Sequence, residues 1–176
     1  MNEHNRTNRI VNYVGGAVVF IFFCSALLMA EDIMYWDNFS GPIAIPNISS
    51  KNQVQENHLS VILHTSGDAE ITAENGTVAQ LHSDGYKDTL KTEYMLSFDG
   101  HGSDGKTGGA DTGYITYNNF LTPTTPAVIT HVLVPVPDDD VVVTLSVRAS
   151  NYPVDVADAG LYEATQTLTV HWTGPP

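Results

Sequence analysis

Cysteine is nearly absent from this chain of 176 residues, which contains only Cys24. A single cysteine excludes an intrachain disulfide, a zinc site built on cysteines and a CxxC redox motif. Basic residues are also scarce, because seven Lys and Arg stand against twenty Asp and Glu, for a formal net charge of −13. Without a basic cluster, we expect no nucleic-acid partner and no attraction to anionic lipid.

Charge of either sign is limited, since charged residues make up 15% of the chain and apolar residues 42%. This composition is too hydrophobic for a disordered chain, so we expect one folded domain with a sizeable core. Motifs with catalytic or metal-binding spacing are missing as well, because the sequence contains no GxSxG, HxH or HExxH. We therefore predict no enzymatic activity, no metal site and no required cofactor.

The amino-terminal end has the layout of a secretory signal peptide. Arg6 and Arg9 precede an apolar stretch over residues 10–30, and a polar pair follows it. We expect export to the periplasm or the cell surface, with cleavage after Ala26 or Ala30. The alternative is an uncleaved anchor through residues 10–30, since an apolar helix of about 20 residues can cross a bilayer. In that case the membrane is a partner through this stretch only.

From Leu59 onward the hydrophobic pattern has period two, which indicates β-strands, and no stretch keeps helical spacing over three turns. Three long runs, at residues 90–98, 141–149 and 162–172, each have one apolar face. We predict an all-β fold, an antiparallel immunoglobulin-like (Ig-like) β-sandwich of about eight strands. Shorter strands are expected at residues 59–64, 69–73, 78–82, 114–118 and 127–134. The chain divides into a signal peptide or anchor (1–30), an extended arm (31–57) and the β-sandwich domain (58–176).

A glycine-rich segment between two expected strands contains three carboxylates, those of Asp99, Asp104 and Asp111. Oxygen-rich loops of this kind bind calcium, but the spacing is not that of an EF-hand. We interpret the segment as a solvated loop and keep a weak calcium site as the alternative.

Two other groups of residues could carry binding chemistry. The first is the acidic triplet of residues 138–140, which we interpret as a solvated turn because consecutive acids before a strand point in divergent directions. The second is a set of aromatic residues that could stack on a sugar: Tyr35, Trp36, Tyr114, Tyr117 and Phe120. Such residues more often fill a core, so a secreted carbohydrate- or calcium-binding module is the alternative function.

The carboxyl-terminal run begins with Gly160 and Tyr162 and continues as an alternating Thr-Leu-Thr-Val strand. A tyrosine two residues after glycine at the start of a strand is the layout of a structural tyrosine corner. This ending, over about residues 141–172, resembles spore coat protein U and the alpha-type fimbrial (chaperone-usher pilin) subunits of bacteria. The resemblance implies an exported, non-enzymatic subunit with an incomplete Ig-like sandwich. It further implies completion by a strand from a periplasmic chaperone or from a like subunit's amino-terminal arm.

The arm over residues 31–57 is mostly polar and has three possible docking residues, Ile43, Ile45 and Ile48. Only one strand follows Tyr162, so we expect the sandwich to end one strand short, with an unpaired edge at its carboxyl-terminal side. We expect the arm to pair with such an edge on a neighbouring subunit. The alternative is that it folds back and closes the gap within its own chain.

Overall fold

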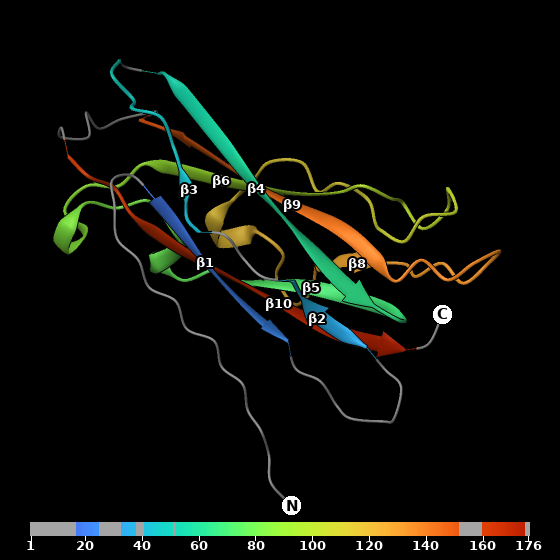
Figure 1. Ribbon diagram of the computed structural model, residues 1–176. Coiled ribbons are helices and arrows are strands. Elements are labelled where there is room, and N and C mark those ends of the chain that lie inside the picture. Colours follow the sequence, from blue (N-terminus) through green and yellow to red (C-terminus); the bar gives the residue numbers. More distant parts are fainter. Residues whose placement is uncertain (1–16, 25–32, 38–40, 51, 152–159, 175–176) are drawn as a thin grey trace, which may run out of the picture.

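The computed structural model describes residues 17–24, 33–37, 41–50, 52–151 and 160–174. Within this part of the chain, ten strands form two sheets of five strands, and three short 3-10 helices lie in the connections (Figure 1). The apolar faces of the two sheets share one core. The predicted all-β sandwich is thus confirmed, with more strands than expected.

The two sheets take their strands from distant parts of the chain. Sheet A has the order β3 (Ile43–Ala44), β1 (Ala17–Cys24), β10 (Ala164–Gly174), β5 (Asp68–Glu74), β8 (Ala127–Ile129). Sheet B has the order β2 (Met34–Trp36), β4 (Val54–Thr65), β9 (Asp140–Ser150), β6 (Lys91–Phe98), β7 (Ile115–Thr116). The 3-10 helices are η1 (Thr77–Ala79), η2 (Asp84–Tyr86) and η3 (Tyr117–Asn119).

One strand pair departs from the predicted antiparallel arrangement. All other neighbours in the described sheets are antiparallel, whereas β1 and β10 run parallel. A parallel pair needs a crossover connection, and here most of the chain lies between the two strands. Period-two alternation marks a strand but does not show the direction of its neighbour, so the sequence could not reveal this pair.

The long strands bury the faces that their alternation predicts. β9 lies between β4 and β6, and its inward residues have exposed fractions of 3% or less: Val141, Val143, Leu145, Val147 and Ala149. β6 and β10 bury alternate residues in the same way. A slip of one residue would turn these side chains to solvent, so burial specifies the register.

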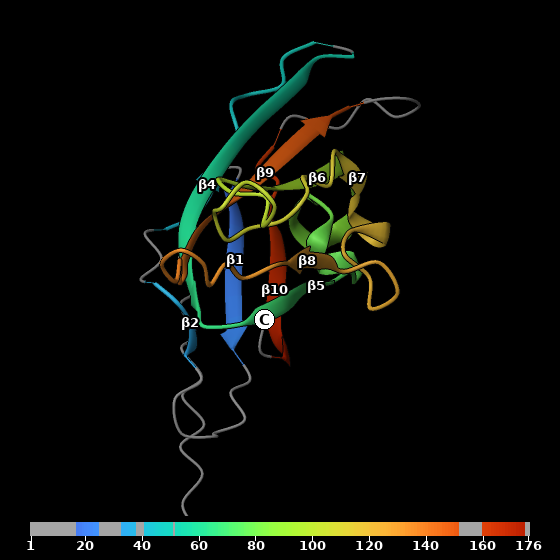
Figure 2. The ribbon, with the colours of Figure 1, turned by 90° about the vertical axis from the view of Figure 1, so that its right-hand side faces the viewer.

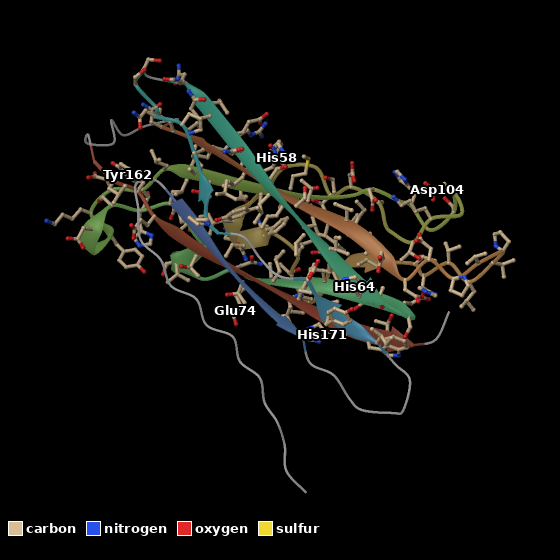
Figure 3. The ribbon with its side chains drawn as sticks, in the orientation of Figure 1. His58, His64, Glu74, Asp104, Tyr162 and His171 are labelled. Atoms are coloured by element: carbon tan, nitrogen blue, oxygen red, sulfur yellow. The ribbon has the colours of Figure 1, made fainter. Side chains whose placement is uncertain are left out.

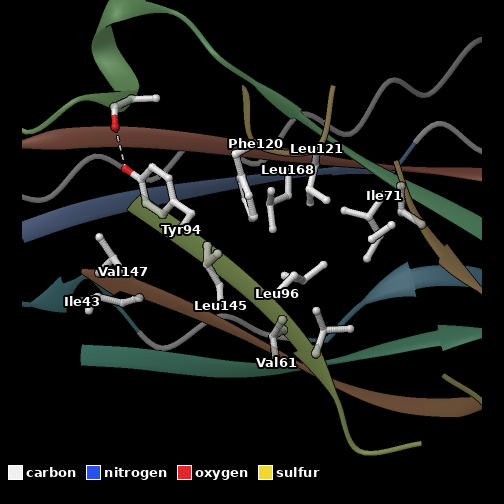
Figure 4. Close-up of a cluster of buried hydrophobic side chains, with 14 of the residues drawn as sticks. Ile43, Val61, Ile71, Tyr94, Leu96, Phe120, Leu121, Leu145, Val147 and Leu168 are labelled. Atoms are coloured by element: carbon white, nitrogen blue, oxygen red, sulfur yellow. Dashed lines mark hydrogen bonds between the residues drawn. The ribbon is translucent and has the colours of Figure 1, made fainter. Parts of the chain in front are cut away.

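Tyr94 shows how a polar group is placed in this core. Its ring lies among apolar side chains of both sheets, and its hydroxyl donates a hydrogen bond of 2.7 Å to the carbonyl oxygen of Ala79 (Figure 4). Burial raises the pKa of Tyr94, which keeps the hydroxyl protonated and able to donate. The bond ties β6 to the turn that contains η1.

The strand expected over residues 78–82 is not formed. Residues 77–79 make the 3-10 turn η1, in which Val78 is 44% exposed and Ala79 is buried. Leu81 is buried two residues later, and its N–H is bound by the Thr92 hydroxyl at 2.9 Å instead of by a long ladder. A short apolar run is compatible with several backbone conformations, and here the tertiary contacts select a 3-10 turn.

Candidate functional site

β10 has a different kind of neighbour at each edge. On one side it pairs with β5, antiparallel, from Thr167–Glu74 to Gly174–Asp68. On the other side it pairs with β1, parallel, over seven register positions from Val18–Ala164 to Cys24–Val170. Figures 1 and 2 show β1 lying along β10. The described part of the predicted leader is therefore a strand of sheet A.

The far side of β1 is covered only at its start. β3 pairs with Ala17 and Val18, and no strand among the described residues pairs with the rest of β1 on that side. Sheet A thus depends on β1 for one edge of β10, while β1 itself is held mainly from one side. Among the described residues, no helix is long and apolar enough to cross a membrane.

The three isoleucines of the predicted donor arm lie on their own domain. Ile43 is 2% exposed in the core, and Ile45 and Ile48 are partly buried against it. The side-chain amide of Asn57 donates to the carbonyl oxygen of Ala44 at 2.7 Å, which fastens β3 to β4. The described arm residues thus lie on their own domain, but the strand that closes the β10 edge is β1 and not the arm.

The chain enters β10 where the tyrosine corner was predicted. Gly160 precedes the strand, and Tyr162 is buried in the core two residues before Ala164. Backbone bonds of 3.0 and 2.9 Å join Glu163 to His82 and fix this entry point. Figure 3 shows Tyr162 at the opposite end of the sandwich from the glycine-rich loop that holds Asp104.

The predicted calcium loop is held together by its own aspartates. Asp99 accepts a hydrogen bond of 2.7 Å from the backbone N–H of Val142 and forms an ion pair with Lys106. Asp104 accepts from the backbone N–H groups of His101 and Lys106 at 3.2 and 3.1 Å. These bonds lower the pKa of Asp104 because they favour its charged form.

The third candidate, Asp111, accepts a hydrogen bond of 3.2 Å from the backbone N–H of Phe98. Across the part of the chain that the structure describes, no three His, Cys, Asp or Glu side chains are grouped so that they could hold a metal ion. The three carboxylates of this loop thus act as separate backbone acceptors.

The acidic triplet of residues 138–140 is largely exposed, as expected of a solvated turn, but its side chains are also hydrogen-bonded. Its side chains do diverge, but each meets a partner on a different segment. Asp138 accepts from the Thr107 N–H at 2.7 Å, Asp139 lies 2.8 Å from His131 Nε2, and Asp140 lies 2.5 Å from His64 Nδ1. The triplet joins the glycine-rich loop, the segment after β8 and strand β4. No sequence spacing connects these partners, so sequence reasoning missed them.

The five aromatic residues considered as a sugar platform are divided between core and surface. Phe120 is fully buried, and Trp36 and Tyr117 are partly buried against the core. Tyr35 is half exposed and stacks on His64, with ring centroids 4.4 Å apart. These aromatic residues therefore do not form one platform.

A charged cluster covers one end of the outer face of sheet B. Arg148 donates to Glu93 at 2.9 and 3.1 Å, Lys91 pairs with Glu93 at 2.9 Å, and the Tyr114 ring lies 4.0 Å from the Arg148 guanidinium. Partial burial raises the pKa of Glu93, but the hydrogen bonds from Lys91 and Arg148 outweigh it and leave the pKa lowered. Partial burial and the hydrogen bond to Glu56 raise the pKa of Tyr114.

No protein-family model matches this chain, and no curated protein sequence matches it. What is established is the fold class, an all-β sandwich. The likeness of residues 141–172 to fimbrial subunits remains a prediction from the sequence.

Proposed function

We propose that this protein is an exported, non-enzymatic structural subunit of the cell surface, of the fimbrial type, which assembles by β-strand complementation. The observation that carries the proposal is the β10 edge. It holds a strand from the far end of the chain, in parallel register over seven positions. The partners would be like subunits or a periplasmic chaperone.

The physical basis is the state of β10 without that strand. Backbone N–H and C=O groups from Ala164 to Val170 would be unpaired along one edge, and such an edge is a template for another strand. Leu168 and Val170 are fully buried core residues on the same strand. An added strand would restore these hydrogen bonds next to buried core residues.

A structural role also accounts for the histidine and aspartate contacts. His64 and His131 pair with acids that brace loops, at 2.5 and 2.8 Å. His171 contacts the Thr72 hydroxyl at 3.3 Å, but within the described residues no carboxylate is hydrogen-bonded to that imidazole to orient it as a base. These groups support a braced scaffold rather than a catalytic centre.

Export is the remaining part of the proposal. Arg6 and Arg9 before the apolar residues 10–30 support a secretory leader, and the lone Cys24 supports a fold that needs no disulfide. Both features fit a protein of the periplasm or cell surface.

The test is complementation of an opened chain. Protein lacking residues 1–24 is refolded together with a soluble carrier protein that displays residues 10–30. We expect a one-to-one complex on a sizing column and a higher melting temperature, because a bound strand stabilises the native state by mass action. The matched control carrier has Phe20→Pro and Ile21→Pro. Equal behaviour of the two carriers, or no complex with either, would argue against complementation at β10.

A further inference from the structure

We infer that residues 17–24 are the chain's own occupant of the β10 edge, retained in the folded protein, and that they keep a single copy closed until another strand displaces them. This inference rests on the proposed function, since it names what fills the same edge before assembly. It differs from the predicted donor arm, whose strand β3 pairs with Ala17 and Val18 of β1 and not with β10.

The occupant is well suited to be a strand. Its sequence, AVVFIFFC, consists of β-branched, aromatic and small apolar residues, without proline or charge. Such residues favour strands. The register with β10 runs from Val18 to Cys24 without a bulge, opposite alternately buried residues of β10: Ala164, Gln166, Leu168 and Val170.

Among the residues that the structure describes, no other segment near this edge is free to replace it. β3, the nearest candidate, is fastened to β4 by the Asn57–Ala44 hydrogen bond, and Ile43 anchors it in the core. As far as the described residues go, the edge opens when β1 leaves and is then available to a strand from another molecule.

The same geometry makes β1 displaceable. From Val19 to Cys24 its only strand partner among the described residues is β10. Removing β1 breaks one long ladder, the two-residue pairing with β3 and the contacts with β2, and it leaves the β10–β5 pairing in place. A covered edge protects a single copy from uncontrolled pairing.

The inference conflicts with cleavage after Ala26 or Ala30. Either cut would remove Cys24 and the whole of β1 from the mature protein. We therefore expect the folded protein to keep residues 17–24, with any cut falling before Ala17. Intact mass of the folded protein measures this directly.

The lone cysteine supplies the decisive experiment. Cys24 is in register with Val170, and residues paired across neighbouring strands lie about 5 Å apart, within the range that a disulfide can bridge. Full-length protein with Val170→Cys is oxidised with copper phenanthroline and analysed on non-reducing gels. We expect most of the protein to become a cross-linked monomer that remains monomeric on sizing.

The matched control is Thr173→Cys, on the same strand but beyond the β1 register, where we expect about tenfold less cross-linking. Cross-linked dimers or ladders would overturn the inference, because the strand would then belong to a second copy, while the proposed assembly would be supported. No cross-link above the control would also overturn it. The carrier experiment would still test the proposed function independently.

A second variant tests closure itself. Phe20→Pro with Ile21→Pro in the full chain removes two consecutive N–H groups, one of which faces β10, because successive N–H groups of a strand point to opposite edges. We expect this variant to form dimers or polymers at concentrations where the parent stays monomeric. The proline variant could stay monomeric while Val170→Cys cross-links within one chain. That result would show that residues 17–24 fill the β10 edge. It would also show that the protein does not assemble through this edge, which would contradict the proposed function.

Discussion

β9 and β10 are the central strands of the two sheets, and they differ in where their neighbours come from. Both have eleven residues and alternate buried with less buried side chains over most of their length. β9 lies between β4 and β6, both from the body of the sandwich. β10 has β5 on one side and, on the other, β1, which is distant from it in the sequence. Two strands with similar sequence patterns thus differ in their neighbours. β9 has both neighbours from the body of the sandwich, whereas β10 depends on a distant segment for one of them.

This difference between β9 and β10 predicts that stability is unevenly distributed between the two sheets. The ladder between β4 and β9 runs without interruption from Val54–Ser150 to His64–Asp140. β10 loses one of its two ladders if a single terminal segment leaves. We therefore expect sheet A to open locally at a lower free energy than sheet B.

Deleting residues 1–24 should have the largest effect on stability, and that effect should fall on sheet A. We expect the free energy of unfolding to fall by on the order of 5 kcal/mol, because the backbone hydrogen bonds along one whole edge of β10 are lost together. Urea denaturation measures the loss. Hydrogen exchange should show lost protection at residues 164–170 and retained protection in β9. Equal loss in both strands would contradict an independent sheet B.

Leucine-to-alanine substitutions in β9 and β10 should show how much each core position depends on β1. Leu168→Ala and Leu145→Ala should each destabilise the full chain by about 3 kcal/mol, because both side chains are buried. In the chain lacking residues 1–24, Leu168→Ala should cost less, since its surroundings are already open, while the cost of Leu145→Ala should be unchanged. Additive effects for both would show that β1 does not cover this part of the core.

Asp139→Ala tests a contact that joins the two sheets. Asp139 precedes β9 of sheet B and binds His131, which follows β8 of sheet A and has a side chain only 1% exposed. Loss of this partner should cost about 2 kcal/mol, because a buried polar ring is left unsatisfied. Asp140→Ala is the control, since its pair with His64 is more exposed and should contribute less than about 1 kcal/mol. Thermal melts compare the two, and a larger cost at Asp140 would contradict the bracing role of His131.

Glu93→Gln should have the smallest effect, and it concerns sheet B alone. Because hydrogen bonds lower the pKa of Glu93 in the folded protein, its stabilisation is fully present above the ordinary value of 4.5. It is lost as the pH falls through the folded pKa. The contribution should be below about 1 kcal/mol. Between pH 7 and pH 3 the melting temperature of Glu93→Gln should fall less steeply than that of the parent protein. Glu74→Gln, in sheet A, serves as the control.

Much of the fold could be predicted because a strand that is buried on one face has an alternating apolar and polar sequence. The alternation at residues 90–98, 141–149 and 162–172 predicted which side chains of β6, β9 and β10 are buried. The sequence located the carboxylates of the glycine-rich loop but did not predict what they bind. Whether Asp99, Asp104 and Asp111 converge on an ion or bind separate N–H groups depends on how the loop folds.

Local residue patterns were enough to predict that the chain forms strands, which faces those strands bury and where the acidic loops lie, because each of these depends on neighbouring residues. The packing of distant segments places an apolar, leader-like segment parallel to β10 and brings three consecutive aspartates to three different segments, and local patterns do not contain that information. These outcomes depend on which distant parts of the chain pack together. A hydrophobic run can satisfy its burial in a membrane or at a sheet edge, and its residues alone do not distinguish the two.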